Sequence, residues 1–266
     1  MQHQPRFRSR LATSVALLAV AAGATACGSD TDDTDADPSS DASTGQATDQ
    51  PTDQPTGQAT GALSSDQVQE AAITMDNLGD GWSEETDDSD ESDDDSDAPG
   101  CFGEISDITK RVEATEKAER TYAYGDQGLP QVTSKVSSYD DADTLSGLFD
   151  QVEDTAEGCS AINFTEDDYE YDLQVKTFPD LPLDDVDDQF TFAAGGSVTS
   201  TTSSSDTASM YLYYTMIRVG STVTTVATTA IDDAVNQQQA LAETAAARLT
   251  AVVAGDNGEE TAIPAP

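Results

Sequence analysis

The residues best suited to chemistry in this chain are three cysteines and a single histidine. The cysteines are Cys27, Cys101 and Cys159, and the histidine is His3. Cys27 follows three arginines, an apolar stretch over residues 11–22 and a run of small residues, an arrangement typical of a secretory signal. The apolar stretch is shorter than the roughly 20 residues of a membrane-spanning helix. We therefore expect residues 1–26 to be a signal peptide that is cleaved before Cys27 and takes His3 with it.

Small residues surround the expected cleavage point. Ala24, Thr25 and Ala26 precede Cys27, and Gly28 follows it. They resemble the lipobox of bacterial lipoproteins, whose cysteine thiol receives a diacylglyceryl group before cleavage, although Ala24 stands where a leucine is usual. We expect Cys27 to carry lipid and to anchor the exported chain to the outer face of the cell membrane. The alternative is an ordinary signal in which the cysteine falls by chance.

The other two cysteines are expected to form a disulfide. Thiols of exported proteins tend to be oxidised, and Cys101 and Cys159 are the two that remain once Cys27 carries lipid. In the loop-entropy model a bridge of this span stabilises the fold by about 4 kcal/mol. The alternative is a pair of free, buried thiols.

Several kinds of catalytic and metal site require residues that the chain lacks once His3 is cleaved off. Without His3 the chain has neither the commonest general base nor the commonest metal ligand near neutral pH. It also has no G-x-S-x-G motif and no Cys/His set for zinc. Asp93, Asp95 and Asp97 alternate as in a calcium loop, but Ala98 replaces the glycine that such a loop requires. We expect no catalytic residue, no metal ion and no cofactor.

The net negative charge of the chain limits the partners that it can bind. The 266 residues carry a formal net charge of −41, which repels nucleic-acid phosphates and anionic headgroups. We therefore expect no nucleic-acid partner, and we expect lipid on Cys27, rather than charge, to hold the protein at a membrane. Among 52 acidic residues any pair of carboxylates is unremarkable, so hydrolysis by two carboxylates is only a third hypothesis.

Four tyrosines and one arginine are the candidate ligand contacts. Tyr122 and Tyr124 would share one face of a strand, as would Tyr211 and Tyr213, because alternate residues of a strand point the same way. Such pairs either line a cleft for an apolar or sugar ligand, or pack beneath a helix with their hydroxyls at the edge. Arg218 lies on an otherwise apolar strand, where it would pair with an acidic side chain or contact an anionic ligand.

Composition separates the chain into a tether and a folded domain. Residues 27–61 are mainly Asp, Ser, Thr, Gln, Gly, Pro and Ala, which predicts a disordered acidic tether. The folded domain is expected over residues 62–254, with a solvated acidic loop at 84–98. Residues 255–266 are expected to be a disordered tail.

Hydrophobic periodicity predicts the elements that must position the candidate residues. Helix starts are expected at Ser64 or Ser65, at Asp140 or Asp141, and at Asp232 or Asp233. Strands are expected over residues 120–124, 132–139, 169–178, 190–194, 209–219 and 222–229, with a loop at 195–206. Gly220-Ser221 is expected to be a two-residue hairpin turn. Consecutive strands with short links favour an α+β domain, a mostly antiparallel sheet with helices packed on one face.

Several of these features occur together in one known family. They are Pro99-Gly100-Cys101, the strands with Tyr122 and Tyr139, the helix start Asp140-Asp141-Ala142-Asp143, the hairpin over residues 217–223, and the alanine-rich last helix. Residues 101–253 thereby resemble the PknH-like extracellular sensor domain, found on actinobacterial receptor kinases and on free-standing lipoproteins. The resemblance implies a sheet with packed helices and an open cleft, no established enzymatic activity and no agreed ligand. The family often has a second disulfide in its C-terminal half, where this chain has no cysteine.

The leading hypothesis is a non-enzymatic, surface-exposed lipoprotein whose domain binds a cell-envelope ligand or a membrane partner. The alternative is a structural or accessory envelope protein that acts by protein–protein contact. A cleft lined by tyrosine and apolar residues would favour the first, and an exposed apolar patch over a filled core would favour the second. Two carboxylates facing each other across a groove would favour the hydrolase.

Overall fold

The computed structural model describes residues 61–85, 99–202, 207–258, 261–263 and 266 of the chain. The predictions for the signal peptide, for Cys27, for the tether up to residue 60 and for the calcium-like aspartates lie outside these residues. None of the described helices is long and apolar enough to cross a membrane.

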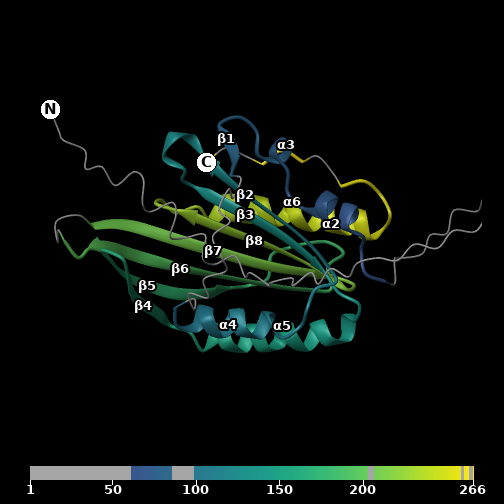
Figure 1. Cartoon of the computed structure of the whole chain (residues 1–266), viewed down its shortest axis with the longest axis horizontal. Coiled ribbons are helices and arrows are strands. Elements are labelled where there is room, and N and C mark those ends of the chain that lie inside the picture. The colour runs from purple at the N-terminus through teal and green to yellow at the C-terminus, as the bar shows by residue number, and fades with distance from the viewer. Residues whose placement is uncertain (1–60, 86–98, 203–206, 259–260, 264–265) are drawn as a thin grey trace, which may run out of the picture.

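The described residues form one antiparallel sheet of eight strands (Figure 1). Its strands are β1 (Trp82–Glu85), β2 (Glu116–Tyr124), β3 (Gln131–Ser138), β4 (Ala161–Glu166), β5 (Tyr169–Phe178), β6 (Asp188–Ser200), β7 (Thr207–Val219) and β8 (Thr222–Ala230). Their order across the sheet is β1-β2-β3-β8-β7-β6-β5-β4. Gly220, in the turn between β7 and β8, has a positive φ of 60°, as the first residue of such a hairpin turn requires. The α+β prediction and the predicted hairpin are both confirmed.

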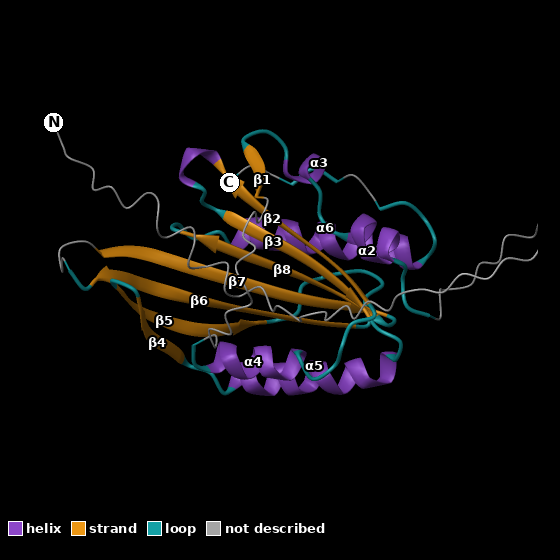
Figure 2. Cartoon of the chain, viewed as in Figure 1, coloured by secondary structure: helices purple, strands orange, loops and turns teal. Residues whose placement is uncertain are grey.

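Helices cover both faces of this sheet, so the expectation of one covered face is wrong (Figure 2). The helices are α2 (Ser65–Ala71), α3 (Met75–Leu78), α4 (Cys101–Thr109), α5 (Ala142–Glu157) and α6 (Val235–Val253). Neighbouring residues of β7 show the reason, because apolar side chains leave the strand on both sides. Met216 packs in the cluster that includes α4 and α5, whereas Ile217 packs on Ala242 and Ala246 of α6.

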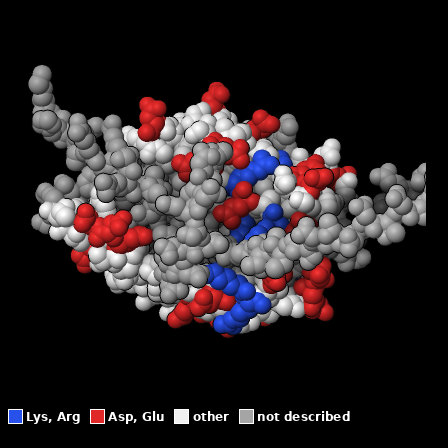
Figure 3. All heavy atoms as spheres, in the orientation of Figure 1, with Lys and Arg blue, Asp and Glu red and all other residues white. Residues whose placement is uncertain are grey.

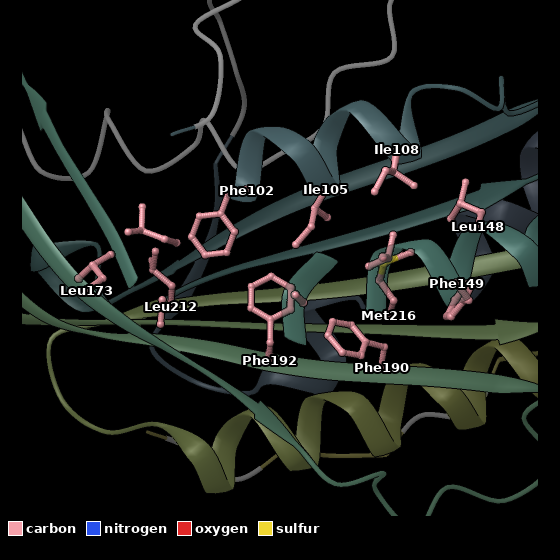
Figure 4. Close-up of a cluster of buried hydrophobic side chains, with 14 of the residues drawn as sticks. Phe102, Ile105, Ile108, Leu148, Phe149, Leu173, Phe190, Phe192, Leu212 and Met216 are labelled. Atoms are coloured by element: carbon pink, nitrogen blue, oxygen red, sulfur yellow. The ribbon is translucent and has the colours of Figure 1, made fainter. Parts of the chain in front are cut away.

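The α4–α5 layer rests on the predicted apolar stripe of α5. Leu145, Leu148, Phe149 and Val152 are buried, and the Asp141 side chain caps the helix by accepting from the N–H of Asp143. In Figure 4 the α4 side chains Phe102, Ile105 and Ile108 point toward Phe190 and Phe192 on the sheet. The expected disulfide joins Cys101, the first residue of α4, to Cys159, just after α5, with their Cα atoms 6.0 Å apart.

The opposite layer joins α2 to α6 through a buried arginine. Ser64 begins α2 with a capping box, in which Ser64 and Gln67 bond each other's backbone N–H groups. Arg248 of α6 is only 5% exposed. Its Nε donates to the carbonyl oxygen of Ala72 at 2.8 Å, and its Nη2 donates to that of Glu70. These bonds satisfy carbonyl groups that the end of a short helix leaves without partners.

Several segments differ from the sequence expectations, among them strand β4, which was not predicted. Helix α4 was not predicted, because its nine residues include Gly103 and carry only three buried apolar side chains. The start of the predicted acidic loop belongs to β1, where Glu85 lies opposite Thr121 of β2. Strand β6 continues into the predicted loop as far as Ser200. Gly196 allows β5 to approach closely there, because a Cβ would lie 1.9 Å from the carbonyl oxygen of Asp172. In the expected disordered tail, Ile263 is buried and donates its N–H to the carbonyl oxygen of Asn77 at 2.7 Å.

Candidate binding site

A cavity among the described residues lies at one end of the sheet and has a volume of about 640 Å³. One wall is the β2–β3 connection, residues 124–130, and the other is the β8–α6 connection with the first turn of α6, residues 230–237; Pro266 also lines it. We call this space the end cavity. Its volume falls within the roughly 300–1,000 Å³ of known ligand pockets.

Tyr124 is the aromatic residue of the first wall. Its ring lies edge-to-face on Trp82, with the ring centroids 5.3 Å apart. A Cβ at Gly81 would come within 2.7 Å of the Tyr124 ring, so a glycine is needed to let the ring lie there. The N–H of Gly125 donates to the carbonyl oxygen of Gly81 at 2.9 Å. Tyr124 is therefore held in place by the β1 side of the molecule.

Asp233 fixes the second wall. Its Oδ1 accepts a hydrogen bond of 2.6 Å from the hydroxyl of Tyr213 and another of 3.1 Å from the N–H of Val235. The bond from Tyr213, more than the one from Val235, lowers the pKa of the Asp233 carboxyl. Burial, and then the neighbouring carboxylate, raises the pKa of the Tyr213 phenol. Asp233 therefore stays ionised near neutral pH and ties the connection to β7.

Gln237 is the most unusual polar residue of the cavity. It is only 8% exposed, and neither its Nε2 nor its Oε1 makes a hydrogen bond within the described part of the chain. The next residue, Gln238, is also buried but is fully bonded. Its amide contacts the hydroxyls of Thr228 and Thr215 at 2.6 and 2.9 Å and the carbonyl oxygen of Val226 at 3.0 Å. A buried amide without partners lowers the free energy of unfolding by about 1–3 kcal/mol, so Gln237 destabilises the fold at this position.

A second concave region, the sheet groove, lies where the α4–α5 layer leaves β3 and β8 uncovered. Phe102 and Tyr214 border it on the apolar side, and Thr225 and Lys135 border it on the polar side. Lys135 forms an ion pair with Glu119 at 3.7 Å, and burial lowers the pKa of its ammonium group. In the view of Figure 3 the visible Lys and Arg side chains form a band from the upper middle to the lower edge of the face, with Asp and Glu beside and between them. The groove encloses about 80 Å³, room for a few water molecules, so the end cavity is the better candidate.

One of the four candidate tyrosines, Tyr124, lines the end cavity. Tyr213 lines the sheet groove instead, and its hydroxyl bonds the Asp233 carboxylate of the cavity wall. Tyr122 is completely buried and donates its hydroxyl to the carbonyl oxygen of Ile73 at 2.8 Å, so it packs with side chains of α3 and α6 rather than lining a cleft. Tyr211 faces Gly195 on β6, where a Cβ would come within 3.0 Å of its ring.

Arg218 lies away from the end cavity and bonds acidic side chains. Its Nε donates to Oδ2 of Asp188 at 2.6 Å, and its Nη1 donates to the carbonyl oxygen of Gly220 at 3.0 Å. Asp187 lies 3.6 Å from the same Nη1 and also accepts from the N–H of Gly220. These contacts tie the β7–β8 hairpin to the start of β6.

Sequence reasoning missed Gln237 and the β8–α6 connection. One signal was present, since Gln237 precedes Leu241 by four residues and therefore lies on the apolar face of α6. An amide in an apolar stripe is expected to be buried, and a buried amide normally has a hydrogen-bond partner. Among the described residues, no group of three or more His, Cys, Asp and Glu side chains is arranged to hold a metal ion.

No protein-family model matches the sequence, and no curated protein matches it either. One solved structure that the chain resembles is the extracellular domain of PknH from Mycobacterium tuberculosis, with a TM-score of 0.51 and 12% sequence identity. The similarity covers 73% of this chain and 98% of that chain. It confirms a PknH-like fold, and at this identity it shows the fold alone.

Proposed function

We propose that this protein is a non-enzymatic, lipid-anchored binding protein that captures a cell-envelope ligand in the end cavity. The observation that carries the proposal is the cavity itself, which combines a ligand-sized volume with one aromatic wall and a few convergent polar groups. The core residues around it are closely packed, with Leu241 and Val226 completely buried, so the space belongs to the fold rather than to a loose core.

The proposed location is the outer face of the cell membrane. Two observations support it: the lipobox-like residues around Cys27, and a fold similar to the extracellular domain of PknH. Lipid on Cys27 would leave the domain free to sample ligands or membrane partners. Replacing Cys27 with Ser is expected to move the protein from the membrane fraction to soluble or unprocessed forms. Unchanged partitioning of this variant into detergent would exclude the anchor.

A hydrolytic role is less well supported, although carboxylates line both walls of the cavity. Asp126 belongs to the first wall, and Asp232 and Asp233 belong to the second. Hydrolysis by two carboxyl groups requires one that remains protonated as the acid. Asp233 is held ionised by its hydrogen bond from Tyr213. Its role is better explained as a hydrogen-bond acceptor.

A role by protein contact alone is also less well supported. The exposed large apolar side chains of the described residues are Ile231 and Val235, 45% and 39% exposed. Both belong to the connection that forms the second wall, and Ile231 lines the cavity itself. Two side chains do not make the broad apolar patch that a stable protein interface needs.

Native mass spectrometry of the full chain purified from cell envelopes tests the proposal. The protein is expected to carry a copurified ligand. Asn236→Trp should remove that ligand, because Asn236 is an exposed residue of the lining and an indole there would fill the space. Gln239→Trp is the matched control, an exposed position on the same helix that does not line the cavity. Equal ligand occupancy in both variants would contradict the proposed site.

A further inference from the structure

The unpaired amide of Gln237 restricts the kind of ligand that suits the end cavity. An amide presents one acceptor oxygen and one donor nitrogen, fixed next to each other on the same carbon. In the free protein both atoms are buried and make no hydrogen bond to the described residues, so the side chain must rotate toward the cavity that it lines before a ligand can bond it. No hydrogen bond holds the amide in its buried position, and a ligand that supplies both an acceptor and a donor at neighbouring positions would satisfy both atoms.

Neighbouring hydroxyl groups meet this requirement. Each hydroxyl can donate one hydrogen bond and accept others, so two hydroxyls on adjacent carbons can bond both atoms of one amide. Asp232 and Asp233 line the cavity as further acceptors for hydroxyl hydrogens. Oδ1 of Asp233 is occupied by Tyr213 and Val235, which leaves Oδ2 to face other donors.

The rest of the cavity wall suits the carbon skeleton of such a ligand. Tyr124 offers an aromatic ring, and Leu129 and Ile231 offer apolar surface. A sugar ring has an apolar face of C–H groups and a rim of hydroxyls, so it matches a wall with these two kinds of surface. The Tyr124 ring is already fixed by Trp82, so little side-chain entropy is lost on binding.

The charges of the lining select against an anionic ligand. Asp126, Asp232 and Asp233 all line the cavity, and none of the described residues that line it is a lysine or an arginine. A phosphate or carboxylate group would meet these carboxylates without a cation to compensate. The lining therefore favours a ligand without negative charge.

We infer that the ligand of the end cavity is a neutral, hydroxyl-rich molecule, a saccharide or a polyol, whose neighbouring hydroxyls bind the Gln237 amide. This inference rests on the proposed function, because it names the ligand class of the same site. A free sugar and the end of a glycan chain share this chemistry.

Titration of the full-length protein with neutral sugars tests the inference. The probes are methyl α-D-glucopyranoside and myo-inositol as small ligands, maltotriose as a chain, and glucuronate as the anionic counterpart. Trp82 is the single tryptophan and contacts Tyr124, so its fluorescence should change when a sugar ring lies on Tyr124. Calorimetry gives the affinity independently. At least one neutral probe should bind at millimolar concentration, and glucuronate should bind more weakly than the glucoside.

Gln237→Leu separates recognition from folding. It should weaken binding of the neutral probe at least about tenfold, since two hydrogen bonds to the ligand are lost. It should leave the melting temperature unchanged or higher, because an amide without partners is replaced by an apolar side chain of similar size. Gln239→Leu, at an exposed position of the same helix, should change neither property. Gln238→Leu should lower the melting temperature, because it breaks three buried hydrogen bonds.

Three results would overturn the inference. They are the absence of binding by every neutral probe, tighter binding of glucuronate than of the glucoside, and a fall in melting temperature for Gln237→Leu as large as that for Gln238→Leu. A non-saccharide ligand that copurifies and is displaced by Asn236→Trp would overturn the ligand class and leave the proposed site intact. If no ligand copurifies and no probe binds, both the site and its ligand class are wrong.

Discussion

The hydroxyl of Tyr213 on β7 donates a hydrogen bond of 2.6 Å to Oδ1 of Asp233, twenty residues later in the chain. Asp233 lies in the connection between β8 and α6, so this bond ties the chain just before α6 to the strand β7. The same oxygen accepts from the N–H of Val235, the first residue of α6. The carboxylate therefore stabilises the helix start and shapes the end cavity together.

Tyr213→Phe is expected to destabilise the fold and to raise the pKa of Asp233. The loss is expected to be about 1 kcal/mol, below the range for bonds to buried charges because Asp233 is exposed. Asp233 has a lowered pKa when folded, so its contribution is present above the ordinary value of about 3.9 and is lost as the pH falls through the folded value. Urea unfolding at pH 7 and at pH 3 measures this change. The difference between wild type and variant should shrink at pH 3, and an equal difference at both would contradict an ionised acceptor.

Alkaline unfolding should report on Tyr171 and Tyr214. Burial raises the pKa of each phenol to about 12. A raised pKa means that their contribution is complete below about pH 10, the value of an unfolded tyrosine, and is lost as the pH rises through about 12. Tyr171 also stacks on Phe164, with ring centroids 4.2 Å apart. Absorbance titration should show these two phenols ionising well above pH 10, and Tyr→Phe at either position should remove one such late step.

Breaking the Cys101–Cys159 bond is expected to cost about 2–5 kcal/mol, because the bond closes a loop of 58 residues. Cys101→Ser and Cys159→Ser should lower the melting temperature by similar amounts, and the double variant should be no less stable than either single one. Peptide mapping under non-reducing conditions should recover the two residues in one linked pair. Two free thiols in the exported protein would contradict the bond.

Arg248→Met is expected to destabilise the protein by about 3 kcal/mol, because it leaves the carbonyl groups of Glu70 and Ala72 without their charged donor. Arg248→Lys should recover only part of the loss, since an ammonium group lacks the planar fork of the guanidinium. Arg111→Met is the control, because Arg111 is exposed and its side chain bonds the surface residue Gln151 at 3.0 Å. Urea unfolding measures all three variants, and similar stabilities for Arg248→Met and Arg111→Met would contradict this role.

Local sequence patterns were sufficient to predict the β7–β8 hairpin and the helix α5. The turn Gly220-Ser221 and the stripe from Leu145 to Val152 are short-range signals, and the structure follows both. The fold class followed from the same signals, because strands with short links pair with their neighbours. The extension of β6 was hidden because Gly195 and Gly196 read as a loop, and only the approach of β5 and Tyr211 explains them.

The candidate site was harder to predict because its walls come from distant segments. Tyr124 and Gln237 lie more than a hundred residues apart and meet only because β2, β3 and β8 are neighbours in the sheet. Whether Gln237 has a partner depends on that packing, as the contrast with Gln238 shows. The pairing of Arg218 with Asp188 is likewise a contact between strands, which local periodicity does not reveal.

The position of β8 in the sheet also decides when the molecule can fold. Strand β8 lies between β3 and β7, and Ser138 at the end of β3 bonds Thr222 across 84 residues of chain. Until β8 leaves the ribosome or a secretion channel, β3 is an open sheet edge and the β1–β3 segment has no helix α6 to cover it. A nascent chain that emerges from its N-terminus must therefore wait for residues made near the end of synthesis. A chain that stalls before Thr222 would present that edge to chaperones, to proteases and to other copies of itself.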